Sequence, residues 1–309
     1  MLDRYLWGTV GRISPEAPVP IVNITGTSVV LGGAANVAAN VVGLGGKATL
    51  AGVCGDDADS ATLRDLLGTA KIDFELLSVA GRPTTVKTRL VAHSQQVARF
   101  DNEVSSAIPP ATSETFLRSI RNSFDSASVV IISDYAKGLL TGEVIAEIIA
   151  TAKNRGVRVI VDPKGRDYSK YSGANILTPN RREAAEAASL DENDPELISK
   201  AGADLVSRLD LEALLITEGE HGMTLFERSV PSVHFDTAAR DVYDVTGAGD
   251  TVIASFAAAL GANATLSQAA QIANVAAGLS VEEVGTTVVS GDAIRKRLGS
   301  DNANVAQFV

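Results

Sequence analysis

The second part of the chain alternates short apolar runs with segments whose apolar residues recur at helical spacing. Residues 129–133 form a continuous apolar run, typical of a strand buried on both faces, and residues 142–155 follow with a helical period. Further strands are predicted at 157–161, 175–178 and 213–217, and further helices at 181–188, 195–208, 248–260, 266–283 and 291–298. This order predicts an α/β fold with a mostly parallel central sheet and helices on both faces.

The first hundred residues have a different pattern, rich in β-branched side chains. We expect short strands at 18–25, 28–31, 84–92 and 96–101, and helices at 33–42 and 57–67. Because these strands do not continue the strand–helix alternation, we expect them to form a small separate sheet.

Polar residues follow four of the predicted buried strands. In parallel sheets, ligands bind at the edge where the carboxyl ends of the strands meet. The residues concerned are Asp134, Asp162, Lys164, Asn180, Glu218 and Gly219. For any one of them, turn or cap chemistry is the better explanation. Four strand ends in succession favour a binding site.

Composition excludes several classes of protein. Of the 309 residues, 45% are apolar and 21% are charged, as in a folded soluble domain. A net charge of -10 disfavours binding to nucleic acid or to an anionic membrane. One cysteine excludes an intrachain disulfide, and with three histidines it also excludes a Cys/His zinc cluster, which favours a reducing, cytoplasmic location. The longest apolar runs reach about half the ~20 residues of a membrane span.

The most specific motif runs from Asp244 to Asp250 and precedes an apolar helix. Gly247 and Gly249 leave backbone amides uncovered at a helix N-terminus, which attracts anions. Asp250 in the first turn is placed to accept a proton from a hydroxyl that attacks a phosphate. An ordinary helix cap is the alternative. The chain lacks GxxxxGK[ST] and GxGxxG, which disfavours a P-loop NTPase and a standard dinucleotide-binding dehydrogenase.

A second glycine motif opens the helix predicted at 33–42. Gly32 and Gly33 permit close approach of a ligand, and Asn36 offers both a donor and an acceptor, which suits sugar hydroxyls. Close packing of strand and helix through small residues explains the same pattern equally well.

Four segments together resemble the ribokinase (PfkB) family of carbohydrate kinases. They are GGAANVA at 32–38, TPNRRE at 178–183, ITEGEHG at 216–222 and DVTGAGD at 244–250, in the order and spacing of that family. The resemblance implies one three-layer α/β domain over residues 1–309, with a β-rich lid near 8–31 and 84–101. The segments LDRYLWGTVGRISPEAPVPI, RFDNE and SDYAKG look most like family members that act on D-glycero-β-D-manno-heptose 7-phosphate.

That resemblance implies ATP-dependent phosphorylation of the anomeric hydroxyl of this heptose phosphate, a step toward ADP-heptose and the lipopolysaccharide core. Two alternatives remain open: a kinase for another sugar or sugar phosphate, and a relative that binds nucleotide and sugar without turnover. ATP and Mg²⁺ are the implied cofactors, and K⁺ is a further candidate.

The resemblance also implies roles for individual residues. Asp250 matches the catalytic base, and the amides of Gly247, Ala248 and Gly249 match the anion hole. Asn180 and Glu183 match a nucleotide-phosphate motif in which Glu183 assists Mg²⁺, and Asp244 matches a position beside a monovalent cation. The nucleotide side further includes Thr217, Gly219, Gly222 and Lys164. The sugar side includes Asp3, Gly32, Gly33, Asn36 and Asp134, with Arg99 and Lys137 as basic candidates for a substrate phosphate.

The resemblance gives expectations about assembly and chain ends as well. Lids of this family often pair between subunits, so we expect a homodimer through the lid. Relatives carry a strand before the segment that matches Leu2–Tyr5, and we expect that strand to be missing. Bifunctional relatives carry a nucleotidyl-transferring domain after the kinase. Since the chain ends at Val309 without an HxGH motif, we expect a separate adenylyltransferase.

Overall fold

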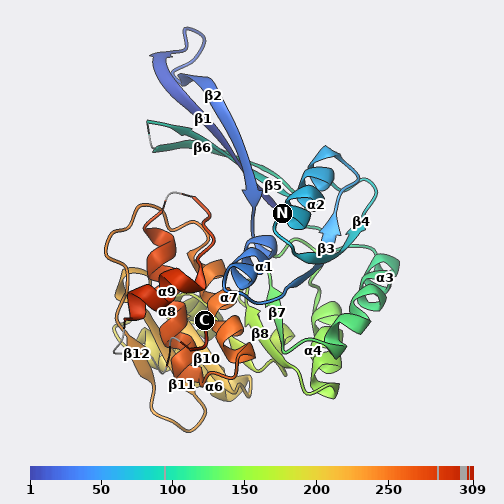
Figure 1. Cartoon of the computed structure of the whole chain (residues 1–309), viewed down its shortest axis with the longest axis vertical. Coiled ribbons are helices and arrows are strands. Elements are labelled where there is room, and N and C mark those ends of the chain that lie inside the picture. The colour runs from blue at the N-terminus through green and yellow to red at the C-terminus, as the bar shows by residue number, and fades with distance from the viewer. Residues whose placement is uncertain (94, 284, 300–304, 306) are drawn as a thin grey trace.

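A computed structural model describes residues 1–93, 95–283, 285–299, 305 and 307–309 (Figure 1). Its largest sheet has six strands in the order β12-β11-β10-β9-β8-β7. They are β7 (Val129–Ser133), β8 (Arg158–Asp162), β9 (Ile176–Leu177), β10 (Ala213–Thr217), β11 (Met223–Glu227) and β12 (Val233–Phe235). β7 to β10 pair in parallel, whereas β11 and β12 pair antiparallel. The sheet is therefore mostly parallel, as predicted.

Helices cover both faces of this sheet, which confirms the predicted three-layer α/β fold. On one face lie α3 (Pro110–Ile120), η1 (Arg121–Asp125), α4 (Gly142–Asn154), η2 (Ser169–Tyr171), α5 (Arg181–Ala188) and α6 (Leu197–Arg208). On the other lie α7 (Ala248–Gly261), α8 (Leu266–Val281) and α9 (Gly291–Leu298). Side chains of β10 alternate between the layers: Leu214 packs on the first face and Leu215 on the second.

The early part of the chain forms a smaller unit beside the six-stranded sheet. β3 (Thr49–Cys54) and β4 (Asp73–Ser78) pair in parallel, and α1 (Ala34–Gly43) and α2 (Ala58–Thr69) pack with them around a third apolar cluster. β3 and β7 each lie at the edge of their own sheet. The strands β3 and β4 were not predicted. Most of their positions are half-buried or exposed: only Leu50 and Cys54 of β3 are buried, and no residue of β4 is.

Four strands form a sheet that extends away from the helical layers, which we call the projecting sheet (Figure 1). Its order is β2-β1-β5-β6, with bounds β1 (Leu2–Ile13), β2 (Pro20–Leu31), β5 (Val86–Ala92) and β6 (Gln95–Asn102). β1 pairs antiparallel with β2 and parallel with β5. Strands predicted at 18–25 and 28–31 are one continuous strand, because the hairpin pairing continues past Gly26. Residue 94, within the expected lid segment 84–101, lies outside the described residues.

The remaining short element is η3 (Gly219–His221), between β10 and β11. Within the part of the chain that the structure describes, we find no helix long and apolar enough to cross a membrane.

Candidate active site

The motif at residues 244–250 forms the loop that starts α7. Gly247 is the N-cap in the left-handed region, at φ 82°, and a side chain there would come within 2.7 Å of the Thr286 methyl carbon. Asp250 follows in the first helical turn and is 5% exposed. The amide of Ala248 donates to the carbonyl of Val245 at 3.2 Å, so one of the predicted anion-hole amides is engaged within the loop.

The Asp250 carboxylate has two side-chain donors. Asn36 Nδ2 donates to Oδ2 at 3.1 Å, and the Tyr135 hydroxyl donates to Oδ1 at 2.7 Å. Burial raises the pKa of Asp250 to about 6, although both hydrogen bonds act to lower it. Burial and the neighbouring Asp250 raise the pKa of Tyr135, so its hydroxyl keeps its proton. Asp250 is thus a buried carboxylate whose pKa lies close to neutral pH, as a general base requires.

A chain of buried amides orients Asn36. Asn40, one turn further along α1, donates from Nδ2 to the backbone carbonyl and to Oδ1 of Asn36, at 3.0 and 3.2 Å. Its own Oδ1 accepts from the Val289 amide at 3.1 Å. Since the Oδ1 of Asn36 is occupied, its Nδ2 is the group presented to Asp250. Our sequence reasoning missed Asn40, although its spacing of four residues from Asn36 places both on one helical face.

The predicted sugar-side residues Asp3, Gly32 and Gly33 also meet here. A side chain at Gly32 would overlap the Asp3 carboxylate, and Gly33 adopts φ 55° beside the ring of Tyr135. Asp3 pairs with Arg89 at 2.5 Å, and the Arg89 side chain is almost fully buried. Arg89 was not singled out in the sequence, because it lies 86 residues from Asp3 and only strand pairing brings them together.

Asp134, a further predicted sugar contact, is engaged by protein groups. Its Oδ2 accepts from the Tyr171 hydroxyl at 2.7 Å and from Lys170 Nζ at 2.8 Å, and its Oδ1 accepts from the Ala136 amide at 2.7 Å. The side chain is 1% exposed. These bonds fix the loop that carries Tyr135, and a direct role in sugar binding stays a prediction.

The predicted nucleotide residues lie at the end of β10 and the start of α5. Asn180 and Glu183 form a capping box: Asn180 Oδ1 accepts from the Glu183 amide at 2.9 Å, and Glu183 Oε2 accepts from the Asn180 amide at 3.1 Å. The other oxygen of Glu183 accepts from Lys164 Nζ at 2.7 Å. The backbones of Thr217 and Asn180 pair in an isolated parallel β-bridge. The structure therefore brings Asn180, Glu183, Lys164 and Thr217 together.

Two glycines shape the loop after β10. Gly219 and Gly222 both adopt positive φ, and a side chain at Gly222 would overlap the carbonyl oxygen of Phe235. Nearby, the pKa of Asp162 is raised by burial and by the carboxylates of Asp250 and Glu183. Asp162 was noted in the sequence only as a strand-end residue, and its closeness to both carboxylates emerges only from the fold.

Asp244, the predicted monovalent-cation residue, ties two loops together. Its Oδ1 accepts from the Thr246 amide at 2.9 Å and its Oδ2 from the Gly285 amide at 3.0 Å. Burial acts to raise the pKa of Asp244, but these hydrogen bonds and Arg89 hold it below its ordinary value. Asp244 is therefore a carboxylate at neutral pH, and cation binding there stays a prediction.

The basic candidates Arg99 and Lys137 each pair with a carboxylate. Arg99 pairs with Asp101 at 3.0 Å and Lys137 pairs with Glu103 at 2.5 Å. Among the described residues, neither forms a hydrogen bond or ion pair with Asp250, and Arg99 is half exposed.

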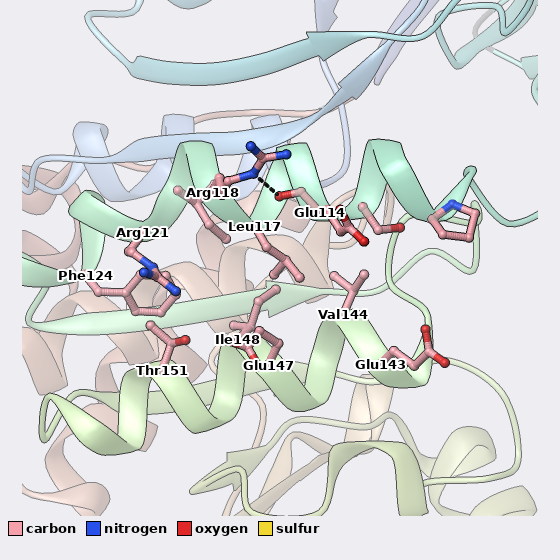
Figure 2. A pocket seen from close by; sticks show the side chains of 13 residues that line it. Glu114, Leu117, Arg118, Arg121, Phe124, Glu143, Val144, Glu147, Ile148 and Thr151 are labelled. Carbon is pink, nitrogen blue, oxygen red and sulfur yellow. Dashed lines mark hydrogen bonds between the residues drawn. The ribbon is translucent and has the colours of Figure 1, made fainter.

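A cavity of about 450 Å³ lies apart from this site, between α3 and α4. Figure 2 shows Leu117, Val144 and Ile148 pointing into it from the two helices, with charged side chains around its rim. Its lining residues include none of those predicted for sugar or nucleotide. We assign the candidate site to the loops around Asp250, because charged and hydrogen-bonding groups converge there.

Comparison with known proteins shows that the chain is a carbohydrate kinase. Residues 3–292 match the model of the pfkB family carbohydrate kinases, and the chain belongs to that family.

Two curated relatives carry the name bifunctional protein HldE. The one from Geobacter sulfurreducens is 44% identical over 300 residues, which cover 97% of this chain and 61% of that protein. The one from Shewanella sediminis is 46% identical over 290 residues, which cover 94% of this chain and 60% of that protein. The chain thus spans about three fifths of the length of these relatives.

Solved structures of sugar kinases share the fold. Phosphofructokinase-2 from Escherichia coli, in complex with potassium, has a TM-score of 0.80 at 20% identity, covering 99% of this chain and 96% of that one. Ribokinase from Arabidopsis thaliana, complexed with ribose and ATP, has a TM-score of 0.76 at 22% identity, covering 96% and 95%. At these identities the likeness establishes the fold alone.

Proposed function

We propose that the chain transfers the γ-phosphate of ATP to the anomeric hydroxyl of D-glycero-D-manno-heptose 7-phosphate, giving the 1,7-bisphosphate. The observation that carries the phosphoryl-transfer part is Asp250, a buried carboxylate with a raised pKa at the N-terminus of α7. The heptose part rests on relatives named HldE at 44% and 46% identity. A kinase for another sugar phosphate of the family is the second candidate.

In the proposed reaction, Asp250 accepts the proton of the anomeric hydroxyl. The hydroxyl oxygen bonds to the γ-phosphorus, and the bond from that phosphorus to the bridging oxygen of ADP breaks. The positive end of the α7 dipole, with the glycine-rich turn before it, stabilises the negative charge of the transferring group. Asn36 and Tyr135 hold the carboxylate in place, and the Tyr135 hydroxyl occupies a position that the substrate hydroxyl must share or take over.

The residues at the start of α5 are suited to bind the phosphates of ATP together with Mg²⁺. Mg²⁺ favours one or two carboxylates together with water and phosphate oxygens, and Glu183 with Asp162 nearby supplies such a set. The ion, when bound, would neutralise charge on the phosphates. Lys164, which pairs with Glu183, is a cation at the same place and would also bind the nucleotide phosphates. We also propose that a potassium ion binds near Asp244.

We further propose that the projecting sheet acts as a lid and pairs with a second copy. It exposes several large apolar side chains: Ile13 at 61%, Ile24 at 49% and Phe100 at 57%. Exposed apolar side chains on the strands of a sheet with open edges are a ready contact for another chain. Closure of such a sheet would exclude water from the transferring phosphate. We place the reaction in the cytoplasm.

Product identification tests the proposed function. The purified chain is incubated with ATP, Mg²⁺ and heptose 7-phosphate, and the products are followed by phosphorus NMR. We expect a second phosphate resonance coupled to the anomeric proton, together with one equivalent of ADP. A product phosphorylated elsewhere, or ATP hydrolysis without a sugar product, would contradict the proposal, and turnover only with other sugar phosphates would favour the second candidate.

A further inference from the structure

Five charged side chains form an unbroken series of ion pairs between the projecting sheet and the loop after β7. We call this series the charge ladder: Arg99, Asp101, Lys87, Glu103 and Lys137. The Arg99 Nε and Lys87 Nζ atoms each lie 3.0 Å from Asp101, on different oxygens. Lys87 Nζ lies 3.2 Å from one oxygen of Glu103, and Lys137 Nζ lies 2.5 Å from the other.

The strand register places the ladder on the face of the projecting sheet that carries Asp3. Lys87 on β5 is directly opposite Asp101 on β6, and residues opposite one another on paired strands point to the same face. On the other side of β5, Lys87 is level with Asp3 on β1. Asp3 lies against Gly32 at the candidate site. The middle of the ladder, at Lys87, therefore lies beside the residues proposed to hold the sugar.

The far end of the ladder is fixed by backbone packing. The Arg82 guanidinium donates to the carbonyls of Val104 at 2.5 Å, Ser106 at 3.1 Å and Lys137. Gly138, at φ 79°, packs so closely that a side chain would overlap the Ser106 carbonyl oxygen. These contacts hold the segment after Glu103 against the loop that carries Lys137, so the Glu103–Lys137 pair is built into the fold.

Lys137 also lies close along the chain to the proposed base. It is two residues beyond Tyr135, whose hydroxyl reaches Asp250. Two residues span at most about 7 Å, so the ladder ends near the floor of the candidate site. It thus connects the sheet above the site with the loop that reaches the catalytic carboxylate.

The charges of the ladder do not balance. Three cations share two carboxylates, which leaves one positive charge in a chain whose net charge is -10. Lys87 is 16% exposed, Asp101 22% and Glu103 20%, so these groups are partly removed from water. Burial acts to raise the pKa of Glu103, but Lys137 and Lys87 hold it below its ordinary value. Asp101 and Glu103 are therefore ionised at neutral pH. If a bound anion took the place of the Glu103 carboxylate, Lys87 and Lys137 would still be paired with a negative charge.

We propose that the charge ladder is the subsite for a phosphate at the end of the carbohydrate opposite its reacting hydroxyl. Lys87 and Lys137 are its ligands, and Glu103 is the carboxylate that it displaces. This inference rests on the proposed function to the extent that a carbohydrate binds at Asp250. One phosphate held by Lys87 of the sheet and Lys137 of the loop also holds the projecting sheet over the site. The ladder thereby favours phosphorylated carbohydrates and couples their binding to closure.

The kinetic test compares Lys87→Met with wild type on heptose 7-phosphate and on the same heptose without phosphate. A hydrogen bond to a charged group is worth about 1.5–3 kcal/mol, so we expect the KM for heptose 7-phosphate to rise roughly 10- to 100-fold. The KM for ATP and all constants for the unphosphorylated heptose should change less than about twofold, since Lys87 contacts neither. Lys47→Met, at an exposed lysine away from the sheet, is the matched control.

A binding test separates this inference from the proposed reaction. Trp7, the one tryptophan of the chain, lies on β1 with its ring 5.6 Å from that of Tyr5, and so reports on the projecting sheet. We expect inorganic phosphate to change its emission saturably in wild type and in Lys47→Met, and not in Lys87→Met or Lys137→Met. This readout needs no turnover, so it holds even if heptose 7-phosphate is not the substrate.

Two results would overturn the inference. One is a wild-type enzyme with equal kcat/KM for a carbohydrate and its phosphate ester. The other is a preference for the phosphate ester, and a phosphate response of Trp7, that remain unchanged in both Lys87→Met and Lys137→Met. If circular dichroism shows that Lys87→Met is unfolded, Lys137→Met decides alone, since it removes the other proposed ligand of the phosphate.

Discussion

The environment of Asp250 explains why one carboxylate among many is suited to proton transfer. Burial raises its pKa, while Tyr135 and Asn36 each donate a hydrogen bond that stabilises the charged form. The balance leaves a pKa of about 6, so the group is ionised at neutral pH and still basic enough to take a proton from a hydroxyl. Without the two donors, burial alone would leave more of the carboxyl protonated.

Replacing Tyr135 with Phe tests this balance. Loss of a hydrogen bond to the charged form, worth about 1.5–3 kcal/mol, should raise the pKa of Asp250 by about one unit or more. The acidic limb of the pH profile of kcat/KM should therefore move to higher pH, while activity well above that limb is retained in part. Tyr243→Phe, at a tyrosine that is 68% exposed, should leave the profile in place. An unchanged acidic limb in Tyr135→Phe would show that this hydroxyl does not tune the base.

Single residues could be predicted where they belong to a sequence motif. Residues that the fold alone brings into contact were missed. Asp250 and Asn36 were named from glycine motifs, Asn180 from its place after a strand, and Glu183 from the family resemblance. The structure brings the four residues into two groups, Asn36 with Asp250 and Asn180 with Glu183. Tyr135 and Arg89 could not be singled out, because their partners lie 115 and 86 residues away. Asn40 was missed although one of its partners, Asn36, lies only four residues before it on the same helix. A tyrosine or arginine outside a motif carries no sign in the sequence of a partner so far along the chain.

Among the elements, the loop between β7 and α4 carries several of the residues that form the site. It carries Asp134, Tyr135, Lys137 and Gly138, and Asp134 and Gly138 anchor it to η2 and to the segment after β6. The Ile108 amide donates to the Gly138 carbonyl at 3.0 Å. The positions of both Tyr135 and Lys137 therefore depend on this anchoring.

Replacing Gly138 with Ala should weaken that anchor. The residue has φ 79°, and the new methyl group would overlap the Ser106 carbonyl oxygen. Strain of this kind costs about 1–3 kcal/mol before the clash is added, so we expect the free energy of unfolding to fall by at least about 2 kcal/mol in urea titrations. Gly68→Ala, in an exposed turn of α2 with open space around it, should instead stabilise by about 0.5–1 kcal/mol. Equal stabilities for the two variants would contradict this account of the loop.

Strands and helices marked by an apolar run or a cap were predicted more accurately than the strands of the projecting sheet. β7, β10, α5 and α9 begin and end where the sequence predicted, because apolar runs and caps mark them clearly. β1 was not recognised as a strand, since its buried positions Leu2, Asp3 and Tyr5 include a charge and give way to exposed residues toward Ile13. The pattern of such a strand reflects its neighbours more than its own sequence.

For the molecule as a whole, the projecting sheet distinguishes the chain from a plain three-layer sandwich. It extends away from the helical layers (Figure 1). Ile13, Ile24 and Phe100 on its strands are exposed apolar side chains. The order of motifs predicted the three-layer fold, but the register of the projecting sheet, and with it the charge ladder, follows only from strand pairing. A protein with a net charge of -10 can hold an anionic substrate through such a local group of cations.

Sedimentation velocity tests the proposed homodimer. Phe100→Glu places a charge on the exposed face of β6, so we expect the variant to sediment as a monomer at micromolar concentration, whereas wild type sediments as a dimer. Val288→Glu, at a valine that is 48% exposed and outside the sheet, should remain dimeric. A wild-type monomer at working concentration, or dimers of both variants, would argue against pairing through the projecting sheet.

The most direct test of the central claim is the turnover of Asp250→Asn. General-base catalysis contributes about 10²–10⁴-fold, so kcat for phosphoryl transfer should fall by at least that factor, while ATP binding by calorimetry stays within about twofold. Asp241→Asn, at an exposed aspartate nine residues earlier, should retain full turnover. If Asp250→Asn turned over at the wild-type rate, Asp250 would not be the base, and the account of this site would be contradicted.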